Sequence, residues 1–231
     1  MRRRILSFSV GIALLLLTVG VFAQRTNKPK SLHIDLSKEK SGKESTKFLA
    51  VVGNWAIVDD GGTKVLGVDG RQWLRGQPAG GLAQNARAIY GSRHEEFIDN
   101  VKAFAYFPYA VLKDVDDFQN GTISMRFKLV EGKLDQCAGI LFNLKLNGDY
   151  LTVRFNSKED NVVLWTFNKG KRSFVKKGTE NVPLQLNTWH TLEITVNGTA
   201  LGASLMESTC LTTRWLNLCQ ERLAFGQRQI V

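Results

Sequence analysis

Residues 135–174, DQCAGILFNLKLNGDYLTVRFNSKEDNVVLWTFNKGKRSF, decide the fold of this chain because their apolar residues recur with a period of two. The repeated apolar side of the first two predicted strands consists of Ile140, Phe142 and Leu144, followed by Leu151, Val153 and Phe155. Asn147-Gly148 and Asn168-Lys169-Gly170 lie where hairpins would turn, since Asn and Gly tolerate the positive φ of tight hairpin loops. The stretch therefore predicts three consecutive antiparallel strands, each with one buried face.

Segments on both sides of this stretch predict further strands. We expect a hairpin over residues 55–68 around an Asp-Asp-Gly-Gly turn, and strands over 122–130, 162–167 and 192–196. Residues 104–112, interrupted by Pro108, predict an edge strand or a bulge. Residues 70–95 predict a long loop with a short strand at Ala88–Tyr90, and no window predicts an amphipathic helix. The pattern indicates an all-β fold, an antiparallel β-sandwich or jelly roll, and about 150 residues suffice for one core.

Residues 1–23 have the pattern of a secretory signal peptide. Arg2–Arg4 form a basic head, an apolar run follows, and Val21-Phe22-Ala23 places small residues at the two positions that a signal peptidase reads. The alternative is an uncleaved membrane anchor, but polar and small residues interrupt a run shorter than the ~20 apolar residues of a membrane span. We therefore expect export to the periplasm or the cell exterior, with no membrane attachment after cleavage before Gln24.

The net charge of +10 is concentrated at the front of the chain. Residues 1–23 carry +3, and residues 24–48 carry seven basic and three acidic residues, whereas residues 49–231 hold 21 basic and 18 acidic ones. Residues 24–47 thus read as a basic, disordered linker with too few apolar groups to fold. A nearly neutral body excludes a nucleic-acid partner, since phosphate backbones are bound by clustered positive charge.

The histidines and cysteines indicate no metal, cofactor or disulfide framework. The chain has an odd number of cysteines, Cys137, Cys210 and Cys219, and we expect Cys137 to be a small core residue. His33, His94 and His190 lack the spacing of metal ligands. We therefore expect no metal and no cofactor.

The chain changes character after Ala200. Residues 202–231, GASLMESTCLTTRWLNLCQERLAFGQRQIV, show no period of two and no hairpin turn, although a sandwich that reaches Val196 still needs closing strands. If the reading frame starts at the third base of each codon, synonymous codons allow the stretch from Met206 onward to encode GKYLFDYTLAEPVSGKVGLWSKADS, which reads as strand, loop and strand. We hypothesise a single frameshift near Ala200–Leu201, which makes residues 201–231 an out-of-frame tail and leaves the domain at 48–200 without its last strands. The alternative is a genuine, divergent tail.

The run from Phe118 to Phe174, followed by LNTWHTLEITVNGT at residues 186–199, resembles the 3-keto-disaccharide hydrolase domain family. Its domains are often labelled family 16 glycoside hydrolase-like and have a concanavalin A-like jelly roll. The resemblance covers about residues 48–200. It implies a sandwich with one concave sheet face, and binding of carbohydrate or activity on it.

The polar side of the predicted central strands is the candidate sugar site. An aromatic ring can cover the apolar face of a pyranose while Arg and Asn side chains bind its hydroxyls. We expect the sugar to contact six residues: Arg126, Asn143, Tyr150, Arg154, Asn161 and Trp165. The alternative is that the aromatic residues pack across neighbouring strands and the arginines solvate an outer sheet face.

No catalytic residue can be named from the sequence. Retaining enzymes of glycoside hydrolase family 16 carry two close carboxylates in an E-x-D-x-x-E or E-x-D-x-E pattern, which this sequence lacks. Its acidic clusters, at residues 95–99, 114–117 and 159–160, are more typical of solvated loops. Two functions therefore stay open: a glycoside hydrolase of the 3-keto-disaccharide type, or a non-catalytic carbohydrate-binding or laminin-G-like module. A structural envelope protein, which binds no glycan, is a third class.

Overall fold

The computed structural model describes residues 31–71, 73–113, 115, 118, 120–132, 135–205, 208–214 and 222–229. The predicted signal peptide, residues 1–23, lies outside these residues and stays a prediction. The described residues from Ile34 onward belong to one compact unit, which carries the fold.

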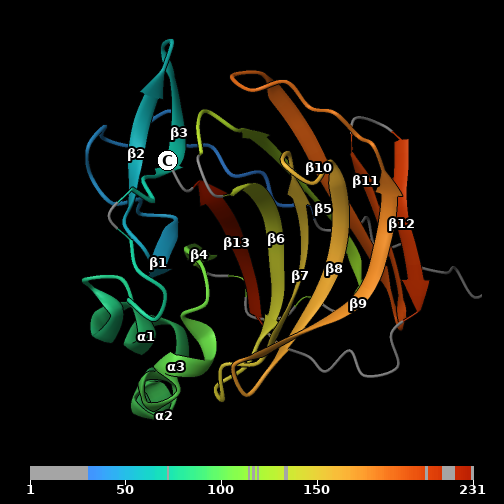
Figure 1. The fold of residues 1–231 in the computed structure, drawn as a ribbon. Helices are drawn as coiled ribbons and strands as arrows, with labels where there is room; N and C mark the ends of the chain where they lie inside the picture. Colours follow the sequence, from blue (N-terminus) through green and yellow to red (C-terminus); the bar gives the residue numbers. More distant parts are fainter. Residues whose placement is uncertain are drawn as a thin grey trace, which may run out of the picture. The chain divides into compact units, whose positions relative to one another are not determined.

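Two antiparallel sheets form the sandwich (Figure 1), which confirms the predicted fold class. The seven-stranded sheet has the order β1 (Phe48–Val52), β4 (Tyr109–Leu112), β13 (Arg222–Gln229), β6 (Gln136–Leu144), β7 (Tyr150–Asn156), β8 (Asn161–Asn168) and β9 (Lys171–Glu180). The four-stranded sheet has the order β12 (Ser208–Arg214), β11 (Ala200–Leu205), β10 (Trp189–Asn197) and β5 (Gly121–Lys128).

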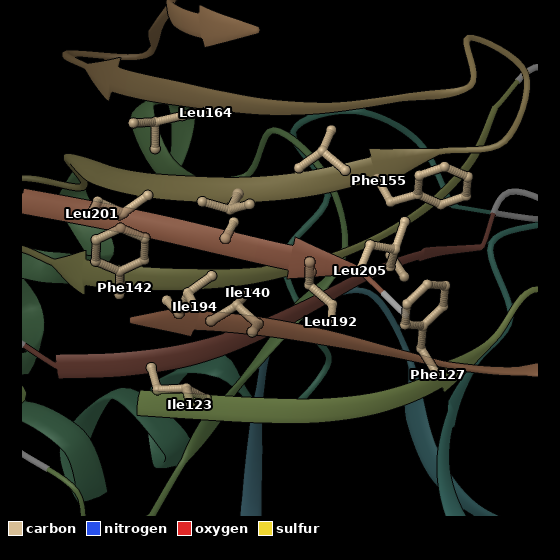
Figure 2. Packing of buried hydrophobic residues seen from close by; sticks show 14 of the residues in the cluster. Ile123, Phe127, Ile140, Phe142, Phe155, Leu164, Leu192, Ile194, Leu201 and Leu205 are labelled. Atoms are coloured by element: carbon tan, nitrogen blue, oxygen red, sulfur yellow. The ribbon is translucent and has the colours of Figure 1, made fainter. Parts of the chain in front are cut away.

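The core between the two sheets follows from the period of two. The pairing aligns Ile140 with Val153 and Val153 with Leu164, so these buried side chains share the inner face of the seven-stranded sheet. They meet Ile194 and Leu201 of the four-stranded sheet (Figure 2). Each fully buried side chain of this size contributes about 1.5–3 kcal/mol to stability, which makes this layer the main source of fold stability.

The opposite face of the seven-stranded sheet, called the outer face below, is partly covered by helices. These are α1 (Leu82–Tyr90), α2 (His94–Asp99) and α3 (Val101–Phe104), with a short 3₁₀ turn, η1 (Gly91–Arg93). Phe97 and Phe104 of the helices cluster with Leu141, Tyr150 and Phe167 of the sheet. The expectation of one buried face per strand is therefore wrong for β6, which is buried on both sides.

The prediction that residues 70–95 form a long loop with a strand at Ala88–Tyr90 is wrong, because α1 and the start of α2 lie there. Leu82, Ala86 and Ile89 occupy one helix face and are all buried, which is an amphipathic pattern. The pattern is short, and a helix of this length is stabilised by packing more than by propensity, so the sequence alone gives a weak signal. The expected edge strand at 104–112 is also corrected, because it shortens to β4, which lies between β1 and β13.

The predicted hairpin is confirmed as β2 (Trp55–Asp60) and β3 (Thr63–Val68), which form a separate two-stranded sheet. Gly61 and Gly62 both have positive φ at its turn. The end of the predicted linker contacts this hairpin: the Gly42 amide donates to the Ile57 carbonyl and the Ile57 amide donates to the Lys43 carbonyl, each at 2.8 Å.

The chain after Ala200 supplies three strands, so the expectation that the last strands are missing is wrong. In β11, Leu201, Ala203 and Leu205 are buried in alternation, a period that the small residues between them obscure in the sequence. The backbone of β13 pairs with β4 on one side and with β6 on the other. Because strand pairing uses backbone groups, it does not report the reading frame, and the frameshift hypothesis stays a prediction.

Candidate functional site

A shallow hollow lies on the outer face of the seven-stranded sheet, over β6, β7 and β8. It has about 370 Å³ of empty space, open solvent included. We call it the Trp165 hollow, and its lining residues are Phe107, Cys137, Ala138, Gly139, Thr152, Arg154, Trp165, Phe167 and Arg172. Thr152 pairs with Trp165, and Phe167 with Arg172, so cross-strand pairing places these side chains on one face.

The hollow exists because the cover on the outer face stops beside it. Phe107, just after the helices, packs edge-on against Phe167 and Tyr150, with ring centres 5.6 Å and 6.0 Å apart. Gly139 keeps the floor flat, since an added Cβ would lie 2.6 Å from the Val153 carbonyl oxygen and 3.0 Å from the Arg154 Cα. A residue larger than glycine would therefore disturb the adjoining strand β7 under the hollow.

Arg154 is held at one end of the hollow by two acceptors. Its Nη1 donates to Asn161 Oδ1 at 3.1 Å, and its Nη2 donates to Glu159 Oε2 at 2.6 Å. Asn161 Nδ2 also donates to Glu159 Oε2, at 3.3 Å. Burial tends to raise the pKa of the Glu159 carboxyl, but the hydrogen bond and charge of Arg154, aided by Asn161, hold that pKa below its ordinary value. Glu159 therefore stays ionised at neutral pH.

A second arginine lies over the aromatic wall. The Arg172 guanidinium carbon is 4.4 Å from the centre of the Trp165 ring and 5.3 Å from that of Tyr106. Arg75 stacks on Tyr106 as well, at 4.0 Å. Phe174 lies edge-on to Trp165 at 5.9 Å and is 58% exposed, which extends the aromatic surface toward solvent.

Sequence reasoning missed Arg172 and Phe174. The signal was present, because both follow the Asn168-Lys169-Gly170 turn and alternate along the strand. A hairpin register across that turn places Phe174 opposite Trp165. Phe107, which lines the hollow, and Tyr106, which contacts Arg172, gave no such signal, since they come from a segment far away in sequence.

The indole Nε1 of Trp165 is buried and has no hydrogen-bond partner among the described residues. Indole nitrogen is a donor only, so an acceptor must come from elsewhere, and a buried donor without one costs about 1–3 kcal/mol. The neighbouring Thr152 hydroxyl donates its hydrogen to the Ile140 carbonyl at 3.1 Å.

The structure brings together three of the six predicted sugar-contacting residues, Arg154, Asn161 and Trp165. Tyr150 lies beneath them, 2% exposed and stacked on Phe167 with ring centres 4.2 Å apart. Two further predicted residues lie apart from the hollow. Asn143 is buried at an irregular position of β6, where its φ is 56°. Arg126 lies on β5 of the other sheet, 5.2 Å from the centre of the Trp189 ring.

The remaining candidate groups lie outside the hollow or inside the core. His190 is buried, with Nε2 2.9 Å from the Gln185 carbonyl oxygen. Asp135 accepts hydrogen bonds from Cys137 Sγ at 3.0 Å and from Asn156 Nδ2 at 2.6 Å. Within the described part of the chain, no three or more acidic, histidine or cysteine side chains gather as metal ligands. Over the same residues, no helix has the length and apolarity for a membrane crossing.

Comparison with known proteins shows the fold. No family model matches the chain, and no curated protein matches it. The structure is similar to the carbohydrate-binding module CBM66 from Bacillus subtilis, with a TM-score of 0.51 and 12% identity over 80% of this chain and 90% of that chain. A Bacillus licheniformis beta-glucanase matches with a TM-score of 0.41 and 12% identity, over 51% of this chain and 56% of that chain. Sheep galectin-11 matches with a TM-score of 0.38 and 12% identity, over 51% of this chain and 84% of that chain.

The first of these likenesses shows the jelly-roll β-sandwich and nothing finer, since only 12% of residues are identical. The other two have lower TM-scores and add nothing to the argument. Membership of the 3-keto-disaccharide hydrolase family stays a prediction.

Proposed function

We propose that this chain is a carbohydrate-binding jelly-roll domain, which binds its sugar in the Trp165 hollow. The observation that carries this proposal is the joining of an aromatic surface to fixed polar groups. Trp165 and the exposed Phe174 offer faces and edges for the C–H groups of a pyranose. Arg154, which Asn161 and Glu159 hold in place, offers hydrogen bonds to its hydroxyls.

The charge state of Glu159 favours binding over catalysis. A general acid must hold a proton near neutral pH, but the pKa of Glu159 lies below its ordinary value because Arg154 stabilises the carboxylate. The hollow itself is lined by no carboxylate among the described residues. A module that binds sugar without cleaving it requires neither a protonated carboxyl group nor a carboxylate in the lining of its site.

A hydrolase of the 3-keto-disaccharide type is the second candidate, and one observation favours it. Burial and Arg154 act most on the pKa of Glu159, and the negative charge of Asp135 tends to raise that pKa, so a second carboxylate lies in the neighbourhood of Glu159. Two neighbouring carboxylates are the usual requirement for glycosidic cleavage. In this reading Arg154, held by Asn161, supports the sugar while the carboxylates react.

Two matched tryptophans test the binding site. Trp165 neighbours Arg154 on one sheet, and Trp189 neighbours Arg126 on the other, so Trp189→Ala is the control for Trp165→Ala. A glycan array followed by calorimetry should show at least a tenfold weaker affinity for Trp165→Ala, which is about 1.4 kcal/mol, and little change for Trp189→Ala. Loss of binding in Trp189→Ala alone would move the site to the four-stranded sheet. The absence of any glycan signal would leave a structural envelope protein.

Hydrolysis is tested with the same protein. Ordinary disaccharides and their 3-keto forms are incubated with the wild-type chain and with Glu159→Gln, and released monosaccharide is measured. Release that Glu159→Gln abolishes would establish the second candidate, whereas binding without release supports the first.

We also propose that residues 1–23 export the domain. Expression in a bacterial host with cell fractionation and intact-mass measurement should find a mature chain that begins at Gln24 outside the cytoplasm. A chain that keeps Met1 in the membrane fraction would instead show an uncleaved anchor.

A further inference from the structure

The polar groups that line the Trp165 hollow are dominated by donors. Arg154 and Arg172 both line it, and a guanidinium group only donates hydrogen bonds. The Thr152 hydroxyl donates to a backbone carbonyl and keeps only its lone pairs for a ligand. A ligand that fits this hollow must therefore bring acceptors.

The two arginines differ in whether a carboxylate of the protein neutralises their charge. Arg154 forms an ion pair with Glu159 at 2.6 Å, so its charge is compensated within the protein. Arg172 forms no ion pair with a carboxylate among the described residues and is held by the faces of Trp165 and Tyr106. Cation–π contact fixes the guanidinium plane but leaves its N–H groups at the edge available. Arg172 thus presents an oriented, uncompensated fork of donors at the hollow.

A carboxylate matches this fork better than a hydroxyl does. It accepts only, it is planar, and it can take two parallel N–H···O bonds from one guanidinium. A neutral sugar hydroxyl also carries a hydrogen that needs a hydrogen-bond acceptor. The described lining of the hollow offers no carboxylate for that role. The charge of Arg172 at the hollow, rather than the net charge of the chain, therefore selects the ligand.

We propose that the Trp165 hollow takes an acidic sugar, whose carboxylate pairs with Arg172 while its ring lies against the exposed Phe174 beside Trp165. The proposal rests on the sugar site proposed above and names its substrate class as saccharides that contain uronic acids. Charge-assisted pairing of this kind raises affinity over a neutral analogue by about tenfold when the site is partly exposed to solvent. The preference should also weaken as salt rises, since exposed charges are screened.

The test compares each acidic sugar with its own carboxyl-reduced form. Oligogalacturonates and glucuronic acid-bearing xylan oligomers are titrated into the full chain by calorimetry, beside the same oligomers after reduction of the carboxylate to an alcohol. At least one acidic oligomer should bind about tenfold more tightly than its reduced form. Arg172→Gln should bring the ratio of acidic to reduced affinity to about one, and this ratio is the readout because Arg172 also lines the hollow.

Arg71→Gln is the matched control, because Arg71 is exposed and its ion pair with Asp69 lies outside the hollow lining. It should keep the full preference. Equal, Trp165-dependent binding of acidic and reduced oligomers would overturn the acidic-sugar inference and leave the proposed function standing. A preference that survives Arg172→Gln would overturn the role of Arg172. Polyglutamate bound as tightly as the oligosaccharides would overturn the sugar class, and an absence of all binding would overturn the proposed function itself.

Discussion

The Arg154 guanidinium and the Glu159 carboxylate meet at 2.6 Å across the turn that joins β7 to β8. The Arg154 side chain is 14% exposed, whereas that of Glu159 is 52% exposed. An ion pair so open to water stabilises a protein by about 0–1 kcal/mol. Its larger effect is orientation, because it holds Arg154 beside Asn161 and Trp165 at the end of the hollow.

The pH dependence of stability should report this pair. The pKa of Glu159 lies below its ordinary value in the folded state, so its stabilisation is present above the unfolded pKa of about 4.3 and is lost as pH falls through the folded pKa. We expect Glu159→Gln to be less stable than wild type by at most about 1 kcal/mol at pH 7, and the gap to close below about pH 4. Urea denaturation at several pH values measures it, with the same substitution in an Arg154→Gln background as the control. A gap that stays constant down to pH 3 would contradict the assigned pairing.

Two phenylalanines separate stability from binding. Phe155 is fully buried between the sheets, and its replacement by alanine should cost about 3–5 kcal/mol of unfolding free energy. Phe174 is exposed beside Trp165, so Phe174→Ala should change stability by no more than about 0.5 kcal/mol while weakening sugar binding. Denaturation and calorimetry on both variants check the contrast. Unaltered glycan affinity in Phe174→Ala would remove Phe174 from the site.

The floor of the hollow should depend on a glycine. Gly139→Ala forces a methyl group against the Val153 carbonyl and the Arg154 backbone, which should destabilise the fold by about 1–3 kcal/mol and weaken binding. Gly80→Ala is the control, because no atom lies within 4 Å of an added Cβ there. Thermal melting of the two variants compares them, and equal melting temperatures would show that the strands move apart at little cost.

The position of β13 can be tested through its backbone. Ala224 pairs with Val111 of β4 and with Leu141 of β6, so Ala224→Pro removes an N–H from a strand with neighbours on both sides. We expect a loss of about 3 kcal/mol or more and a marked fall in melting temperature. Ala224→Ser keeps the N–H and is the control. If both variants melt like wild type, the last residues do not take part in the sheet.

The same position bears on the frameshift hypothesis, which we retain as a proposal. As written, β13 has the sequence RLAFGQRQ, which contains two arginines and two glutamines. The shifted frame places Val-Gly-Leu-Trp over codons 222–226 and GKYLFDYTL over the codons of β12. Expression of both endings should give higher solubility and a melting temperature several degrees higher for the shifted one. An equal or higher melting temperature for the written ending would support a genuine tail.

Local sequence predicted the strands of residues 135–174 well because their apolar residues recur with a period of two between turns that contain Asn and Gly, although β6 is buried on both sides. It failed for residues 82–104, where three short helices are stabilised by the apolar outer face of the sheet rather than by their own propensity. It also failed for Leu201, Ala203 and Leu205, whose alternation is diluted by glycine and serine.

The sequence by itself determined the class of fold and which residues share a side of each strand, since both follow from a period of two over neighbouring residues. Only the tertiary structure decided which strands join the same sheet. It therefore placed Arg126 on one sheet and Trp165 on the other. It also brought Phe107 to a hollow whose other walls come from β6 to β9, and Tyr106 to the Arg172 side chain of that hollow. The physical reason is that sheet membership depends on contacts between distant segments, and periodicity along one strand carries no information about them.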